Sequence, residues 1–144
     1  MIAGLLGLFV CGFFAGAACY INLVEHAARL GLEHRALLAE WKAAYRRGFA
    51  LQAPLAFLGF ALGILAWFET RQPPFLVGGL LMLANWPWTL LVIRRVNSVL
   101  MATAPVDAGP ASRALIVKWN ARHAVRSALG CLAAAAFLYG LSAK

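Results

Sequence analysis

The sequence predicts an all-α membrane protein, a four-helix transmembrane bundle with an additional cytoplasmic interfacial helix. The first reason is composition: 63% of the 144 residues are hydrophobic and 12% are charged, and the mean hydropathy is +0.78, which is too apolar for a soluble domain of this length. The second is that the apolar residues fall into four stretches, each close to the roughly 20 residues that cross a bilayer. One integral membrane domain, residues 1–144, accounts for the whole chain.

The four predicted spans follow one another along the chain, and the connection between the second and third is short. They cover residues of about 1–24, 49–68, 75–94 and 121–141. The first has the length of a retained transmembrane helix rather than of a cleaved signal segment. The last belongs to a longer helix that begins near Ala111, after Pro110, so its first turns should project into water. We expect a tight turn from Glu69 to Pro74 and a loop from Thr103 to Pro110.

Two pairs of glycines predict where helices approach each other closely. Gly12 with Gly16, and Gly59 with Gly63, are each separated by three residues. Such small-xxx-small pairs let a second backbone come near. We therefore expect each pair to face another helix.

Leu30 to Arg47 is predicted to be an amphipathic helix that lies at the membrane surface. Its apolar stripe consists of Leu30, Leu37, Leu38, Trp41 and Tyr45, and its charged residues Glu33, Arg35, Glu40 and Lys42 lie away from that stripe. An apolar stripe opposite a charged face is typical of interfacial helices.

Charge predicts the orientation of the spans. Lys and Arg outnumber Asp and Glu 13 to 5, and most of them fall between spans one and two or between spans three and four. By the positive-inside rule these connections are cytoplasmic, and both termini and the turn at Glu69 lie outside. The basic pI, near 10.3, is thus explained by topology and contact with the lipid bilayer, and no nucleic-acid partner is expected. We expect an integral protein of the bacterial cytoplasmic membrane.

The cysteines predict neither a disulfide framework nor a zinc site. Cys11, Cys19 and Cys131 all lie in apolar spans, they are odd in number, and they lack a metal-ligand spacing. We expect free, buried thiols.

Asn85 and Thr89 mark a polar face at membrane depth in the third span. They are one helical turn apart, so they share a face, and polar groups in hydrocarbon need partners. This face should therefore point into the bundle. Pro87 lies between them and removes a backbone donor, which loosens the helix at that point.

Other polar residues gather at the cytoplasmic ends of the spans and predict a site that opens toward the headgroups. Ionisable groups inside a membrane are functional candidates by default. The candidate catalytic residues are Glu25, His26, His123 and Arg126. The candidate substrate-binding residues are Asn22, Asn85, Trp86, Trp88, Thr89, Asn97 and Trp119.

The same residues also have purely structural interpretations. Asn22, Gln52 and Asn85 can hold helices together by interhelical hydrogen bonds, and the tryptophans can belong to an aromatic belt. Glu25 can serve as the partner of Arg126 or Arg29. A metal site made of Glu25, His26 and His123 is a further alternative, but we expect no metal and no other cofactor, since the chain has no haem motif, phosphate loop or nucleophile elbow.

Three stretches stand in an order and spacing that carry a family resemblance: Asn22 to His26, then Asn85 to Thr89 followed by Asn97, then Trp119 with His123 to Ser127. Together they resemble the four-helix membrane proteins of the anthrone oxygenase-like family, over nearly the whole chain. Many bacterial members have no assigned function. Fungal members oxidise anthrones to anthraquinones with dioxygen and are regarded as needing no metal or organic cofactor. The resemblance therefore implies a cofactor-independent oxidase or oxygenase of a lipophilic aromatic compound, anthrone- or quinol-like.

If that chemistry carries over, a planar phenolic ketone enters from the bilayer and stacks among Trp86, Trp88 and Trp119. His26 or His123 removes an acidic proton, and Arg126, Asn85 and Asn22 stabilise the developing oxyanion. Glu25 orients an imidazole or balances Arg126. The competing hypothesis is a non-enzymatic membrane module in which the same cluster binds a lipid or a partner protein. The sequence predicts neither the substrate nor the oligomeric state.

Overall fold

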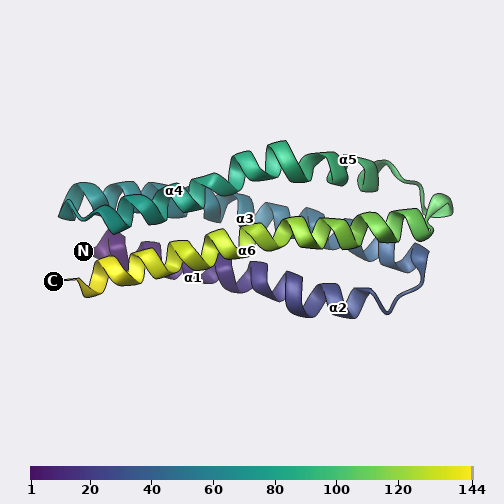
Figure 1. Ribbon diagram of the computed structural model, residues 1–144, viewed down its shortest axis with the longest axis horizontal. Coiled ribbons are helices and arrows are strands. Elements are labelled where there is room, and N and C mark those ends of the chain that lie inside the picture. Colours follow the sequence, from purple (N-terminus) through teal and green to yellow (C-terminus); the bar gives the residue numbers. More distant parts are fainter. Residues whose placement is uncertain (144) are drawn as a thin grey trace.

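The structure is a computed structural model that describes residues 1–143, and it is a bundle of four helical rods lying side by side along one axis (Figure 1). The helical segments are α1 (Ile2–Tyr20), η1 (Ile21–Glu25), α2 (His26–Arg29), α3 (His34–Thr70), α4 (Pro73–Trp88), η2 (Thr89–Ile93), α5 (Arg94–Ala102), η3 (Pro105–Asp107) and α6 (Pro110–Ser142). The predicted all-α class is confirmed.

Each rod is long and apolar enough to cross a bilayer, as expected for an integral membrane protein. The first rod joins α1, η1 and α2, and the third joins α4, η2 and α5. Both chain ends lie at one end of the bundle, next to the connection between α3 and α4 (Figure 1). Most of the basic residues lie toward the opposite end, in the helices next to the other two connections.

The rods form a closed ring in which α1 packs against α3 and α6, and α4 packs against the same two helices. One apolar core fills the end near the termini, around Phe14, Phe75 and Phe137. A second apolar core fills the other end, around Trp41 and Leu100. Most of the buried polar side chains lie at the level between the two cores, and this layer holds the candidate site.

The predicted interfacial helix is wrong as a separate element, because residues 34–47 are the first turns of the continuous helix α3. Their apolar stripe is buried: Leu37, Leu38 and Trp41 are at most 1% exposed and pack against Ile93 and Leu100 of the third rod. The stripe therefore faces protein, where a surface helix would face lipid. An apolar stripe of this kind does not by itself show whether the helix packs against protein or against lipid.

Helix α3 begins at His34 rather than at Leu30, because Glu33 caps it. The Glu33 carboxylate accepts hydrogen bonds from the backbone N–H groups of Arg35 (3.0 Å) and Ala36 (2.7 Å). These bonds, that of Arg35 first, hold the pKa of Glu33 below its usual range because they stabilise the charged carboxylate.

One of the two glycine pairs packs as predicted and the other does not. A Cβ atom on Gly63 would lie 2.6 Å from the Cα of Gly79, and one on Gly59 would meet Met82 at 3.0 Å, so α3 and α4 touch through their backbones here. Gly12 and Gly16 face outward with nothing within 4 Å of an added Cβ. The prediction for that pair is wrong because α1 contacts its neighbours along a different face, through Gly7 and Phe14.

The two predicted connections are confirmed in slightly different form. The first is shorter than expected, since α3 ends at Thr70 and α4 begins at Pro73. Arg71 makes the reversal with a positive φ of 59°. The second, from Thr103 to Gly109, is a loop that contains the short turn η3 before Pro110 opens α6.

Candidate functional site

Two π-helical turns flank the polar layer and widen the rods there. They are η1, from Ile21 to Glu25, and η2, from Thr89 to Ile93. Pro87 precedes η2, and its missing N–H interrupts the α-helical ladder at that point, as the sequence predicted. Residues of both turns line the same pocket. Single π-turns inside α-helices often mark functional sites.

Asn22, in η1, links the first rod to α6 through a network of hydrogen bonds. Its amide nitrogen donates to the Oδ1 atom (2.6 Å) and the backbone carbonyl (2.9 Å) of Asn120. Because these two acceptors fix the orientation of the Asn22 amide, its Oδ1 atom faces the other way and accepts hydrogen bonds. It accepts one from the Ser127 hydroxyl (2.6 Å) and lies 2.9 Å from Nδ1 of His123.

The network determines which nitrogen of His123 carries the proton. The Asn22 oxygen can only accept, so Nδ1 of His123 donates to it, and in the neutral imidazole Nε2 keeps a lone pair. Nε2 has no hydrogen-bond partner in the described part of the chain. The imidazole stacks on Trp119, with 4.8 Å between ring centroids and 26° between planes. His123 is thus a buried, oriented proton acceptor at the pocket.

Arg126 lies one turn further along α6, and its guanidinium is buried. It is 8% exposed, and no carboxylate of residues 1–143 forms an ion pair with it. Its Nε atom has no hydrogen-bond partner in the same residues. The Cζ atom lies 5.5 Å from the centre of the Phe14 ring, a cation–π contact that offsets part of the desolvation. A cation in such surroundings favours an anionic ligand.

Aromatic rings and one amide build the side of the pocket that Tyr45, Asn97 and Trp119 line. The Asn97 amide accepts from the Trp119 indole nitrogen (2.8 Å) and donates to the Tyr45 hydroxyl (3.2 Å). Tyr45 stacks on Trp41 at a centroid distance of 5.1 Å, and Trp41 meets Trp119 edge to face at 5.6 Å. The two hydrogen bonds of Asn97 and the contact of Trp41 with Trp119 join α3, α5 and α6 on this side of the pocket.

The acidic residue at the pocket is already paired. Arg29 is 3% exposed and holds both Glu25, by a hydrogen-bonded ion pair, and Glu40, at 2.9 Å. Of the two partners that the sequence offered for Glu25, the structure selects Arg29, and Arg126 forms no ion pair with a carboxylate of residues 1–143.

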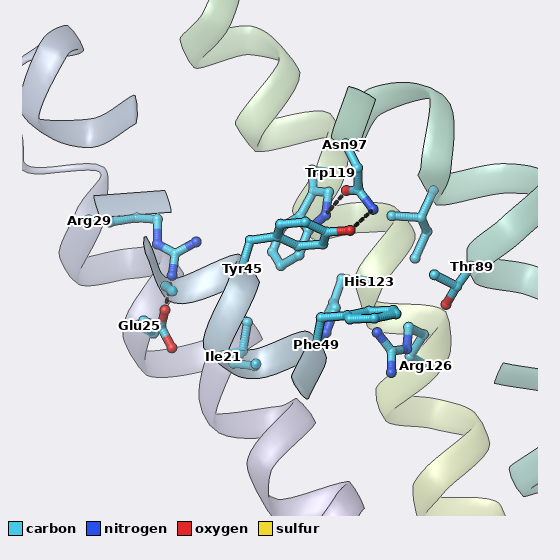
Figure 2. A pocket seen from close by; sticks show the side chains of 13 residues that line it. Ile21, Glu25, Arg29, Tyr45, Phe49, Thr89, Asn97, Trp119, His123 and Arg126 are labelled. Carbon is cyan, nitrogen blue, oxygen red and sulfur yellow. Dashed lines mark hydrogen bonds and ion pairs between the residues drawn. The ribbon is translucent and has the colours of Figure 1, made fainter. Parts of the chain in front are cut away.

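These residues enclose one pocket between α1, α3, the third rod and α6, shown in Figure 2. His123 and Arg126 approach it from α6, while Tyr45 and Phe49 approach it from α3 (Figure 2). Its free volume is only about 20 Å³, which is room for about one water molecule. A neighbouring cavity of similar size is lined by Asn85, Trp86, Thr89 and again Arg126, so the guanidinium lies between the two.

Comparison with known proteins assigns the chain to a family. The family model described as anthrone oxygenase matches residues 41–136, well over half of the chain. The chain belongs to the anthrone oxygenase family. No curated protein and no solved structure matches it.

The matched range of this anthrone oxygenase family member contains most of the pocket. It includes Tyr45, the third rod with Asn85 and Thr89, and α6 with His123 and Arg126. The first rod, with Asn22, Glu25 and His26, precedes the matched range.

The structure brings together most of the residues that the sequence singled out. Those that line the main pocket are Glu25, Thr89, Asn97, Trp119, His123 and Arg126. Asn85 and Trp86 line the adjoining cavity, and Asn22 supports His123 from behind.

Two predicted site residues lie elsewhere. His26 is buried, but it lines neither cavity, and its Nδ1 atom has no partner in the described residues. Trp88 lies in an outer groove and donates from its indole nitrogen to the carbonyl of Arg122 (2.9 Å). It therefore does not wall the pocket, because the turn η2 directs the residues after it inward in its place.

Sequence reasoning missed Tyr45 and Phe49, which line the pocket. Tyr45 is part of the stripe that predicted an interfacial helix. Arg29 also lines the pocket, and the sequence names it only as a possible partner of Glu25. Tyr45 and Phe49 reach the polar layer because α3 is continuous. No local pattern in the sequence distinguishes the two arrangements.

The alternative metal site does not assemble. Residues 1–143 contain no group of three or more His, Cys, Asp or Glu side chains that could hold a metal ion. Glu25 is held by Arg29, and Nδ1 of His123 is engaged by Asn22, so Glu25, His26 and His123 do not fit a shared metal.

Proposed function

We propose that this family member is a membrane-embedded oxidase that uses dioxygen to oxidise a lipophilic aromatic substrate, anthrone- or quinol-like, without a cofactor. The observation that carries the proposal is the pair formed by Arg126, a buried cation with no carboxylate partner in residues 1–143, and His123, whose Nε2 is a free acceptor at the same pocket. A base beside an anion-stabilising group is what carbon deprotonation requires.

His123 is the general base of the proposed reaction. Its Nε2 takes a proton from the activated methylene carbon of the substrate, and the electron pair that remains delocalises onto the ketone oxygen. Asn22 and Ser127 position the imidazole, since Asn22 fixes Nδ1 as the donor. Tyr45 and Trp119 line the pocket beside His123 and flank the reactive edge of the substrate.

Arg126 stabilises the negative charge that develops on the ketone oxygen. Preorganised donors of this kind contribute roughly 3 to 4 kcal/mol each in a site that excludes water. Because the guanidinium has no acidic partner among residues 1–143, it need not break an ion pair to bind the oxyanion.

Dioxygen supplies the oxygen atom and accepts the electrons. The carbanion forms a C–O bond to dioxygen, and the resulting peroxide takes the proton back from His123. His123 then removes the second methylene proton while the O–O bond breaks, which leaves a C=O group and releases hydroxide, and this hydroxide takes up that proton to become water. In sum, CH2 and O2 give C=O and H2O.

The proposed setting is the bacterial cytoplasmic membrane with both termini outside. The basis is the clustering of basic side chains at the end of the bundle where α2 meets α3 and α5 meets α6. Arg71 is the basic residue of the other end among residues 1–143. The pocket then lies in the cytoplasmic half of the bilayer.

The second candidate is a non-enzymatic membrane module that binds a lipid or a partner protein. The observation that favours it is the mutual satisfaction of Asn22, Asn120 and Ser127, because polar groups that only hold helices together are bonded in this way. It predicts no catalysed consumption of oxygen.

Oxygen uptake by the protein in nanodiscs, with anthrone as substrate and a chelator present, tests the proposal. We expect uptake above that of empty nanodiscs, and a loss of about a hundredfold or more in His123→Ala, the lower bound for a general base. His26→Ala should retain most of the activity, since His26 lines neither cavity. Equal uptake with and without protein across several anthrones would reject the oxidase, and a loss in His26→Ala alone would reject His123 as the base.

A further inference from the structure

A groove on the lipid-facing side of the bundle runs beside the pocket, between the first rod and α3. Ala17, Tyr20 and Ile21 form one side, and Gly48, Leu51 and Gln52 form the other. Its free volume is about 370 Å³, whereas that of the pocket is about 20 Å³. The groove can hold a planar ring system as it stands, and the pocket cannot.

The groove and the pocket share a wall. Ile21, Glu25, Ala44 and Gly48 line both of them, and Figure 2 shows Ile21 and Glu25 at the edge of the pocket. Of these, Gly48 has no side chain, and a Cβ atom placed there would lie 3.7 Å from Cδ1 of Ile21. Ile21 belongs to the π-turn η1. The barrier at this point is therefore one isoleucine side chain opposite a bare backbone.

A polar group on the groove is suited to a ligand. Gln52 is 1% exposed, and its Nε2 atom has no hydrogen-bond partner in residues 1–143. A buried amide donor without a partner is unfavourable by roughly 1–3 kcal/mol, so a ligand oxygen in the groove would relieve it.

A second groove of similar volume lies on the outside of the third rod, near Trp88 and Leu91. It shares no lining residue with the pocket. Volume alone does not distinguish the two grooves, but continuity with the pocket does.

We infer that the groove between α1 and α3 is the lateral entrance of the pocket and holds a planar, lipophilic aromatic ketone, with Gly48 setting the width of the passage. This inference rests on the proposed function for the identity of the ligand. The rings lie in the groove, a ring oxygen accepts from Gln52, and the reactive edge passes between Ile21 and Gly48 toward His123 and Arg126. Ligand arrives from the bilayer and does not cross the basic end of the bundle.

Binding kinetics test the entrance separately from the oxidation. The probe is 1,8-dihydroxyanthraquinone, a planar ketone with no methylene group to oxidise, and the signal is saturable quenching of tryptophan fluorescence in nanodiscs. In Gly48→Leu we expect association and dissociation rates to fall by about tenfold or more, because a step that needs a conformational change slows binding. Gly48→Ala should give rates between those of the wild type and those of Gly48→Leu, since its Cβ would lie 3.7 Å from Cδ1 of Ile21 and narrow the passage without overlap.

Ala50→Leu is the matched control, because it adds the same side chain to an exposed position in the same turn of α3. If Gly48→Leu does not fold, the entrance is tested with Ile21→Ala instead. This variant should bind the probe faster than the wild type, because it widens the passage. Unchanged rates in the folded Gly48→Leu protein or in Ile21→Ala would overturn the entrance, as would the absence of saturable quenching in the wild type. Slow binding in Gly48→Leu together with no oxygen uptake in the wild type would support the entrance and reject the oxidase.

Discussion

At the scale of single residues, the pocket combines polar groups that the protein satisfies with polar groups that it leaves free. Asn22, Asn97 and Ser127 are engaged with other side chains. Arg126 and Nε2 of His123 are not, among residues 1–143. Polar groups without hydrogen-bond partners are unfavourable in hydrocarbon. A ligand that bonds to Arg126 and to Nε2 of His123 therefore gains more binding free energy there than at the polar groups that are already bonded.

The role of Asn22 as a positioning residue gives a prediction at this scale. Asn22→Leu removes the acceptor that orients the His123 ring, and we expect kcat for oxygen uptake to fall about a hundredfold with KM nearly unchanged, as for other small misplacements of a catalytic group. Asn22→Asp keeps an acceptor at Nδ1 and should retain more activity than Asn22→Leu, with a shifted pH profile of kcat. The two variants are compared at matched thermal stability. Equal losses and identical pH profiles would show that Asn22 only holds helices together.

Single-residue patterns in the sequence predicted part of the site. His123 and Arg126 are three residues apart at membrane depth, which was sufficient to place them on one stripe. Tyr45 and Phe49 could not be predicted, because their direction depends on how α3 continues across the bundle. Trp88 was misplaced for a related reason, since the π-turn that follows it changes which residues face inward.

At the scale of elements, the π-turns η1 and η2 and the unbroken helix α3 shape the site. The π-turns present Ile21 and Thr89 to the pocket, and α3 carries Tyr45 and Phe49 from the end core into the polar layer. The sequence predicted that the helix is loosened after Asn85, because Pro87 lacks a backbone N–H. The turn η1 contains no proline and was not predicted.

The contact between α3 and α4 gives a prediction at the element scale. A methyl group on Gly63 meets the backbone of Gly79, which cannot move aside as a side chain can. Gly63→Ala should therefore lower thermal stability in detergent, by about 1–3 kcal/mol as for other overpacked interiors. Gly16→Ala is the matched control, because nothing lies within 4 Å of its added Cβ. Equal melting temperatures for the two variants would contradict the packing of α3 on α4.

At the scale of the whole molecule, composition and the four apolar stretches were sufficient to predict the bundle. The sequence does not show that the amphipathic residues after Leu30 extend the second rod, because their stripe would suit a bilayer surface as well as a protein core. The ring of four rods leaves its polar layer between two apolar cores. Any ligand of the pocket must therefore cross a helix interface or the basic end.

Orientation in the membrane is a prediction for the whole molecule. Gln72 lies in the connection between α3 and α4, at the end of the bundle that holds the termini. In Gln72→Cys we expect labelling by a membrane-impermeant maleimide from outside the cell. Asp107→Cys, exposed at the opposite end, should react only after the membrane is opened. The reverse pattern would invert the topology.

The central claim is that His123 removes a proton from a carbon atom inside the membrane while Arg126 stabilises the anion that forms. Hydrogen–deuterium exchange measures this step without oxidation. Anthrone is incubated anaerobically in heavy water with the protein in nanodiscs, and deuterium at its methylene carbon is followed by mass spectrometry. We expect the wild type to exchange faster than empty nanodiscs, His123→Ala to fall to the rate of the empty nanodiscs, and Arg126→Gln to lose about a hundredfold or more. Wild-type exchange rates in His123→Ala, or no exchange above the empty nanodiscs in the wild type, would contradict the account.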